Sequence, residues 1–71
     1  MAKKVYISGE YIKLDCAVKF CGESVTGSEA KAIIAHGGVT VNGETEFRRG
    51  KKLYNGDVFC VNGNEYEIFP R

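Results

Sequence analysis

The sequence carries one dense cluster of groups that can bind anions, in the segment EFRRGKKL at residues 46–53. Four cations fall within five positions of this segment: Arg48, Arg49, Lys51 and Lys52. The whole 71-residue chain has a formal charge of +1 at pH 7, so the residues outside this cluster sum to −3. Guanidinium and ammonium groups form charge-assisted hydrogen bonds with phosphate oxygens. The segment therefore has the chemistry of a phosphate-binding loop, and the same charges would also suit a solvated loop that aids solubility.

A second candidate anion site lies at the start of a predicted helix. Thr26-Gly27-Ser28-Glu29 has the form of a capping box, in which the Thr26 hydroxyl accepts from a helix amide and Glu29 reaches back to the Thr26 amide. The free amides around Gly27 and Ser28 would face an anion, and a glycine lets a phosphate approach closely. Lys31 follows one helical turn after Gly27 and shares its side of the helix. These residues predict a second contact for a phosphate backbone.

The cysteines and the histidine carry the metal-binding and nucleophilic chemistry of the chain. A zinc site built from them fails on spacing, because Cys16 and Cys21 are five residues apart and zinc ligand pairs are usually separated by two to four residues. We interpret Cys16, Cys21 and Cys60 as small reduced hydrophobes, and we predict neither a metal nor a cofactor. His36 falls in the last turn of a predicted helix, where it suits the helix dipole, and no partner group indicates catalysis.

Sequence motifs of the common enzyme classes are absent. The chain has no P-loop, no dinucleotide-binding glycine fingerprint and no nucleophile elbow. A chain of 71 residues also leaves little room for a catalytic cleft, because it buries only about 60% of its unfolded surface. No apolar run approaches the roughly 18 residues that span a bilayer, and the N-terminal apolar stretch is too short for a signal peptide. We therefore expect a single domain over residues 1–71 that is not an enzyme, lies in the cytoplasm and has no membrane partner.

The spacing of apolar residues and turns predicts an α+β fold, in which two short helices pack on a small antiparallel sheet. The first helix runs from Leu14 to a stop at Gly22, and the second runs from the Thr26 cap to a stop at Gly37-Gly38. Asn42-Gly43 predicts a type I′ hairpin turn, since both residues tolerate positive φ. The predicted strands are residues 5–7, 39–41, 44–47, 58–61 and 65–69. The predicted core is Leu14, Val18, Ile33, Ile34, Val39, Val41, Leu53 and Val58.

The order of these motifs resembles the RNA-binding domain named after the small-subunit ribosomal protein S4. That family places two short helices before a turn, then a Val-x-Val-Asn-Gly hairpin, then a Gly-Asp pair that leads into a strand. The matching residues here are 39–43 and 56–57. The small stand-alone bacterial members also carry a Gly-x-Glu-Ala-Lys helix start and an Arg-Arg-Gly-basic-Lys-Leu segment, matched at residues 27–31 and 48–53. The resemblance covers about residues 10–62.

This resemblance implies that the chain binds structured RNA, either ribosomal or transfer RNA, across the two helices and the basic loop. Ribosomes or ribosome-assembly factors are then the expected partners. Many family members carry an arginine directly after the helix-capping residue, and that arginine meets RNA; Gly27 stands there in this chain and cannot make the same interaction. Tyr54 would either stack on a splayed base or pack on the end of the sheet. The expected RNA contacts are Gly27, Ser28, Lys31, Arg48, Arg49, Lys51 and Lys52.

A protein-interaction module is the alternative function. Its glutamates would repel nucleic acid from one side and attract a basic partner, and the strand at residues 65–69 would accept a partner strand if it formed an edge. A salt titration separates the two functions, because RNA binding weakens log-linearly with salt and a mainly apolar protein interface does not. The glutamates concerned are Glu10, Glu23, Glu44, Glu46, Glu65 and Glu67.

Overall fold

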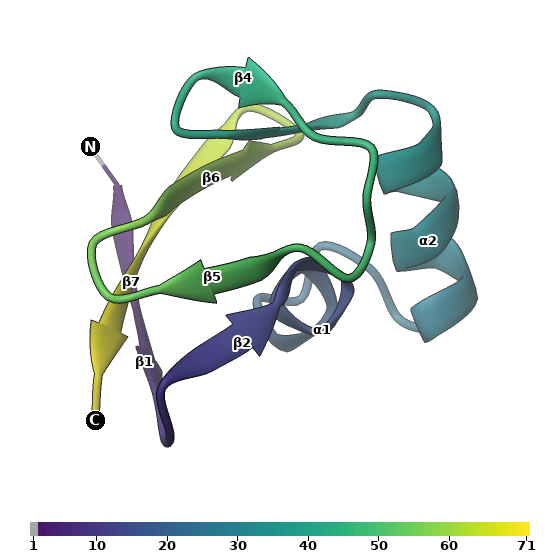
Figure 1. Cartoon of the computed structure of the whole chain (residues 1–71). Coiled ribbons are helices and arrows are strands. Elements are labelled where there is room, and N and C mark those ends of the chain that lie inside the picture. The colour runs from purple at the N-terminus through teal and green to yellow at the C-terminus, as the bar shows by residue number, and fades with distance from the viewer. Residues whose placement is uncertain (1) are drawn as a thin grey trace.

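The computed structural model describes residues 2–71, so Met1, which the predicted domain range includes, lies outside the described residues. Figure 1 shows the two helices next to each other at one side of the domain, with strands β1, β6 and β7 at the other side. Neither helix has the length and the apolar character needed to cross a membrane. The elements follow in the order β1 (Lys3–Ile7), β2 (Tyr11–Lys13), α1 (Leu14–Phe20), α2 (Gly27–Ala35), β3 (Val39–Val41), β4 (Glu44–Thr45), β5 (Lys52–Tyr54), β6 (Val58–Val61) and β7 (Asn64–Pro70).

The strands form two separate sheets. Five strands make one sheet in the order β1-β7-β6-β3-β4, and β2 pairs with β5 in a two-stranded unit that we call the ribbon. Every pair is antiparallel except β1–β7, which is parallel. A parallel pair needs a long connection, and here nearly the whole chain supplies it. The predicted α+β class with two helices packed on a small sheet is confirmed, but the large sheet is mixed rather than antiparallel.

Several strands differ from the prediction. The ribbon strands were not predicted, because three residues are too few to show a period of two. The strand predicted at 44–47 ends at Thr45 as β4. The strand predicted at 65–69 is β7, which lies between β1 and β6 in the sheet. The expectation that this strand offers an open edge to a partner is therefore wrong, since the edge strands of the large sheet are β1 and β4.

One hydrophobic core joins the large sheet, the ribbon and both helices. Six of the eight predicted core residues are buried, whereas Ile33 and Val58 are only half-buried. The error in β6 is one of register, because Phe59 and Val61 face inward and Val58 therefore faces outward. Phe59 is the largest side chain that is fully buried. The core residues are Val5, Ile7, Leu14, Ala17, Val18, Ala30, Ile34, Val39, Val41, Leu53, Phe59, Val61, Tyr66 and Ile68.

The ends of both helices are those that the sequence predicts. The Thr26 hydroxyl accepts from the Glu29 amide at 3.1 Å, and the Glu29 carboxylate accepts from the Thr26 amide at 3.3 Å. This confirms the capping box. The stops at Gly22 and Gly37 both have φ of +79°, where glycine avoids the penalty of a Cβ atom. Gly38 is required by close packing, since a Cβ there would lie 2.9 Å from the Ile33 side chain.

Candidate nucleic-acid interface

The basic segment crosses the first turn of α1. The Lys51 carbonyl accepts from the Leu14 amide at 2.9 Å, and the Arg49 carbonyl accepts from the Asp15 amide at 3.1 Å. The N-cap residue of α1 is Lys13, whose side chain makes no capping hydrogen bond. Lysine has no acceptor atom, so the first amides of the helix need partners from elsewhere. The backbone of the basic segment supplies them, which fixes this backbone beside the start of α1.

Arg48 is neutralised within its own loop. Its Nε lies 3.0 Å from Glu46 Oε2 and its Nη2 lies 3.2 Å from Glu46 Oε1, while the Arg48 amide also donates to Glu46 Oε2 at 3.0 Å. These hydrogen bonds lower the pKa of Glu46 to about 2 and raise the pKa of Arg48. Arg48 – Glu46 is the only ion pair among residues 2–71. Of the four predicted cations of the loop, Arg48 is therefore the one least available to a phosphate.

The ribbon places a further cation next to the basic segment. Lys52 on β5 lies directly opposite Lys13 on β2, in a register that also pairs Tyr11 with Tyr54. The two lysines belong to the same face, because register partners point to the same side of an antiparallel pair. Lys13 was not predicted as a site residue, since it is isolated in the sequence and β2 gave no signal. We call Lys13, Arg49, Lys51 and Lys52 the basic cluster.

The start of α2 is less suited to an anion than the sequence suggests. The Glu29 carboxylate accepts from the Val25 amide at 2.7 Å as well as from Thr26, so a negative charge already sits at this helix end. Gly27, Ser28 and Lys31 are exposed on this element. A Cβ built on Gly27 would meet nothing within 4 Å, so packing does not require the glycine there. An arginine, which the resemblance to the S4-type domain leads us to expect there, would fit at this position.

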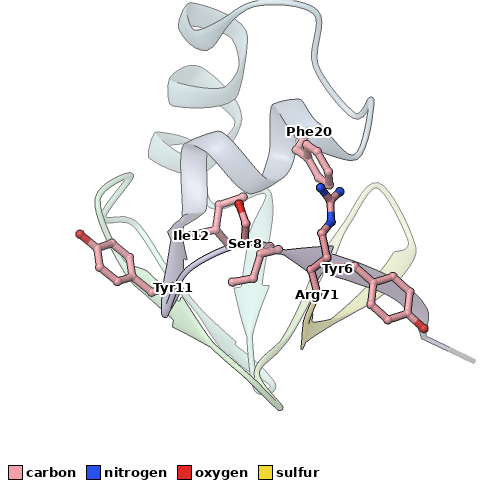
Figure 2. A pocket seen from close by; sticks show the side chains of 7 residues that line it. Tyr6, Ser8, Tyr11, Ile12, Phe20 and Arg71 are labelled. Carbon is pink, nitrogen blue, oxygen red and sulfur yellow. The ribbon is translucent and has the colours of Figure 1, made fainter.

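A shallow pocket between β1, β2 and α1 carries no acid–base pair. Its lining consists of Tyr6, Ile7, Ser8, Tyr11, Ile12, Phe20 and Arg71, without a carboxylate, histidine or cysteine. Figure 2 shows the Arg71 side chain reaching toward Phe20, and the ring of Tyr11 pointing away from the other lining side chains. Proton transfer in an active site needs a titratable group within hydrogen-bond reach of the substrate. This pocket offers only tyrosines and an arginine for that role.

The three cysteines are free thiols, and Cys16 lies on the first turn of α1, close to Lys13 of the basic cluster. Cys16, Cys21 and Cys60 form no disulfide, and no group of three metal-binding side chains occurs within residues 2–71. Burial raises the pKa of Cys21 to about 11 and is the main cause of the raised pKa of Cys16. Protonated thiols are poor nucleophiles and poor metal ligands. His36 is the C-cap residue of α2, which is the place that the sequence predicts for it.

Glu23 forms a structural network with side chains of the β6–β7 hairpin. It accepts hydrogen bonds from the side-chain amides of Asn62 and Asn64, each at 3.0 Å, and from the Tyr66 hydroxyl. These bonds, that from Tyr66 above all, lower the pKa of Glu23, and the same contact raises the pKa of Tyr66 to about 12. The network ties the connection between the helices to the β6–β7 turn. Glu23 is thereby engaged in the fold and is not a free acidic group.

Comparison with known proteins identifies the family of this chain. A model of the S4 domain matches residues 5–69. The chain belongs to the S4 domain family. The probable ribosome maturation protein RlbA of Bacillus subtilis (strain 168) is 38% identical over 63 residues, which are 89% of each chain. The resemblance seen in the motif order is thus confirmed over more of the chain than residues 10–62.

Two solved structures share the S4 fold. The 30S ribosomal protein S4e of Thermoplasma acidophilum superimposes with a TM-score of 0.69 at 27% identity, over 83% of this chain and 31% of that one. YbcJ from E. coli superimposes with a TM-score of 0.66 at 28% identity, over 96% of this chain and 90% of that one. The solution structure of YbcJ revealed a motif, named ALFAL, that is involved in RNA binding.

The S4 motif residues bind one another in the folded chain. Asn42 and Gly43 have φ of +51° and +86°, which confirms the predicted I′ turn. The Asn42 side chain accepts from the Val58 amide at 3.0 Å and donates to Asp57 at 3.2 Å. Asp57 also accepts from the Tyr54 amide at 2.8 Å. The Asn-Gly and Gly-Asp motifs, which lie apart in the sequence, therefore form one hydrogen-bonded unit that holds β5 against the β3–β4 hairpin.

Proposed function

We propose that this S4 domain binds structured RNA, mainly through the phosphate backbone, and that it does so without catalysing a reaction. The observation that carries the proposal is the basic cluster. Its four cations lie on the loop and the ribbon where these meet the start of α1, with Lys51 also lining a pocket beside Glu44 and Glu46, and none of them forms an ion pair with any of residues 2–71. Unpaired cations held by a rigid backbone suit a polyanion, because binding releases its condensed counterions.

The shape of RNA favours this kind of contact. An A-form helix hides its base edges in a deep, narrow major groove and presents phosphates and 2′-hydroxyls at its surface. Arg49 and Lys51 would bind phosphates on one strand, with Lys13 and Lys52 beside them. Gly27, Ser28 and Lys31 would extend the contact onto α2, while Arg48 would contribute only if its bond to Glu46 opened. The preference should therefore follow RNA shape rather than base identity.

The similarity to ribosome-related proteins favours ribosomal RNA over transfer RNA as the ligand. RlbA is described as a probable ribosome maturation protein, and S4e is a protein of the small ribosomal subunit. By this likeness the chain would act in the cytoplasm on ribosomal RNA or on ribosome-assembly intermediates. The alternative, a protein-interaction module, retains only its acidic groups as support, since β7 is not an edge strand.

Crosslinking in cells, followed by sequencing of the bound RNA, tests this function. We expect ribosomal RNA fragments to be enriched with the wild-type protein and depleted in the variant Arg49→Ala/Lys51→Ala. Enrichment of transfer RNA instead would keep RNA binding and reject the ribosomal assignment. Recovery of proteins with no RNA above background would reject the function and favour the protein-interaction module.

A further inference from the structure

The outer face of the ribbon carries two tyrosines and two lysines in a square. Tyr11 lies opposite Tyr54, and Lys13 lies opposite Lys52. The inner face holds Leu53, which is fully buried, so the ribbon is anchored in the core and these four side chains must face outward. Tyr11 is 39% exposed and Tyr54 is 48% exposed. A large aromatic side chain that stays this open on a rigid strand has surface left over for a ligand.

The geometry of the tyrosines leaves ring faces open. The ring centroids of Tyr11 and Tyr54 are 5.9 Å apart and the ring planes are tilted by 50°. Tilted pairs at this distance stabilise each other's orientation without covering both faces, as a parallel stack would. In Figure 2 the Tyr11 ring projects away from the body of the molecule. The two rings therefore form a preorganised platform rather than part of the core.

The lysines give the platform an affinity for anions. Like charges directly opposite each other across two strands are destabilising, and the ribbon contains no carboxylate that would offset them. Two acids close to the ribbon are engaged, since Asp57 accepts from the Tyr54 amide and Asp15 accepts from the Cys16 amide. Glu10, directly before the ribbon, is exposed. Lys52 is further held by a cation–π contact, with its Nζ 4.9 Å from the Tyr11 ring centroid. A phosphate group would relieve the repulsion between the two lysines.

We infer that the ribbon binds an unpaired RNA nucleotide, whose base stacks on Tyr11 or Tyr54 and whose phosphate lies between Lys13 and Lys52. The inference rests on the proposed RNA-binding function and adds to it a single-stranded subsite, built from the two ribbon lysines of the basic cluster and the two ribbon tyrosines. Stacking on aromatic side chains beside cations is the general way in which proteins hold single-stranded nucleic acid. The domain would then recognise a junction, with the paired stem on Arg49 and Lys51 and the unpaired nucleotide on the ribbon.

Two RNAs that share one stem-loop test the subsite, one blunt and the other with a short single-stranded extension. We expect the wild-type protein to bind the extended RNA more tightly than the blunt one. Tyr54→Leu should weaken binding of the extended RNA by about 5- to 150-fold, the equivalent of one stacked base, and leave binding of the blunt RNA unchanged. Tyr54→Phe should retain the wild-type affinity, because it keeps the ring.

Tyr6 provides a matched control, since it is 47% exposed on β1 and lies at the same 5.9 Å from an aromatic partner, Phe69. Tyr6→Leu should change the affinity for neither RNA. Equal affinity of Tyr54→Leu and wild type for the extended RNA would overturn the subsite while leaving RNA binding intact. Failure of the wild type to bind either RNA would instead overturn the proposed function itself.

A measurement on the wild-type protein removes any dependence on how the variants fold. The single-stranded extension alone should shift the ring-proton NMR signals of Tyr11 or Tyr54 upfield, because that ring would lie over a base. The signals of Tyr6 should stay in place. Shifts confined to Tyr6, or no shift of any tyrosine at saturating RNA, would overturn the inference.

Discussion

The ribbon and the β1–β7 edge of the large sheet carry nearly the same side chains. Each has an aromatic pair with ring centroids 5.9 Å apart, Tyr11–Tyr54 on the ribbon and Tyr6–Phe69 on the edge. Each also has a lysine over one of these rings, at 4.9 Å on the ribbon and 5.6 Å on the edge. Composition alone would therefore rate the two surfaces as equal candidates for nucleic-acid binding.

Register makes them different. Lys3 and Lys4 are adjacent on β1, so they point to opposite faces of the sheet, and Lys4 lies opposite Glu67. Lys13 and Lys52 come from distant parts of the chain, yet they lie opposite each other on one face. Two neighbouring lysines are thus dispersed, while two remote lysines are brought together. The proposed phosphate site therefore depends on strand register, and on ribbon strands that contain no carboxylate, rather than on the density of lysines in the sequence.

The largest expected effect concerns how firmly the ribbon is attached. Leu53→Ala should lower the free energy of unfolding by about 2–5 kcal/mol, because it leaves a cavity under a fully buried position. Urea unfolding monitored by circular dichroism measures it. Tyr6→Leu on the exposed edge serves as the control and should cost about 0.5 kcal/mol or less. Equal losses in the two variants would mean that the ribbon is not anchored through Leu53.

A variant of the Asn42-Gly43 turn should change the stability of the fold without changing RNA binding by the ribbon or the edge. Gly43→Val should lower the free energy of unfolding by about 1–2 kcal/mol, since a β-branched residue is strained at φ of +86°. A Cβ there would meet no atom within 4 Å, so strain and not a clash is the cause. RNA affinity, measured where the variant is fully folded, should match the wild type. Unchanged stability would contradict the turn assignment, and a loss of affinity would extend the interface to this hairpin.

Glu46 determines whether Arg48 is free to bind an anion, because the two side chains form an ion pair. Its folded-state pKa of about 2 lies below its ordinary value of 4.5, so the bond to Arg48 contributes stability above pH about 4.5. That contribution is lost as the pH falls from about 4.5 through about 2. In Glu46→Gln this part of the pH dependence of unfolding should flatten. Wild type and variant with identical pH profiles over that range would contradict the assigned bond.

The smallest effect is expected from a variant in which the edge, like the ribbon, has no carboxylate beside its lysine. Glu65→Gln/Glu67→Gln removes the two carboxylates that lie on the same face as Lys4 and Tyr6. RNA affinity measured at low salt should rise by less than about tenfold, because water and salt weaken the electrostatic interaction between exposed charges and RNA. Lys13→Gln/Lys52→Gln, the reverse change on the ribbon, should lower it. An increase in RNA affinity in both double variants would mean that these local charges do not determine where RNA binds.

The features that the sequence predicts well are those fixed by neighbouring residues. The capping box from Thr26 to Glu29, the glycine stops and the Asn42-Gly43 turn all depend on a few successive dihedral angles. The family resemblance was also local in origin, as an ordered set of short motifs. These features place the helices and the hairpin, and with them the basic segment.

The features that the sequence misses depend on contacts between distant segments. The parallel β1–β7 pair and the ribbon join residues that are far apart in the chain, and Lys13 enters the proposed site only through its pairing with β5. The bond from Arg48 to Glu46 was not predicted either, and the RNA contact of Arg48 stays a prediction. Val58 was predicted to be buried because a short apolar strand shows no preferred face. These misses concern which strands pair and which side a residue faces, and both are decided only by the packed fold.

The salt dependence of RNA binding tests the central claim most directly. Arg49→Ala/Lys51→Ala and Lys3→Ala/Lys4→Ala remove the same number of charges, one pair from the basic cluster and the other from the edge. The log-log slope of affinity against salt should shrink by about two for the first pair, since each cation that neutralises a phosphate adds about one to the slope. For the second pair the slope should stay at the wild-type value. Equal shrinkage in both variants, or no change in either, would contradict a phosphate-binding site at the basic cluster.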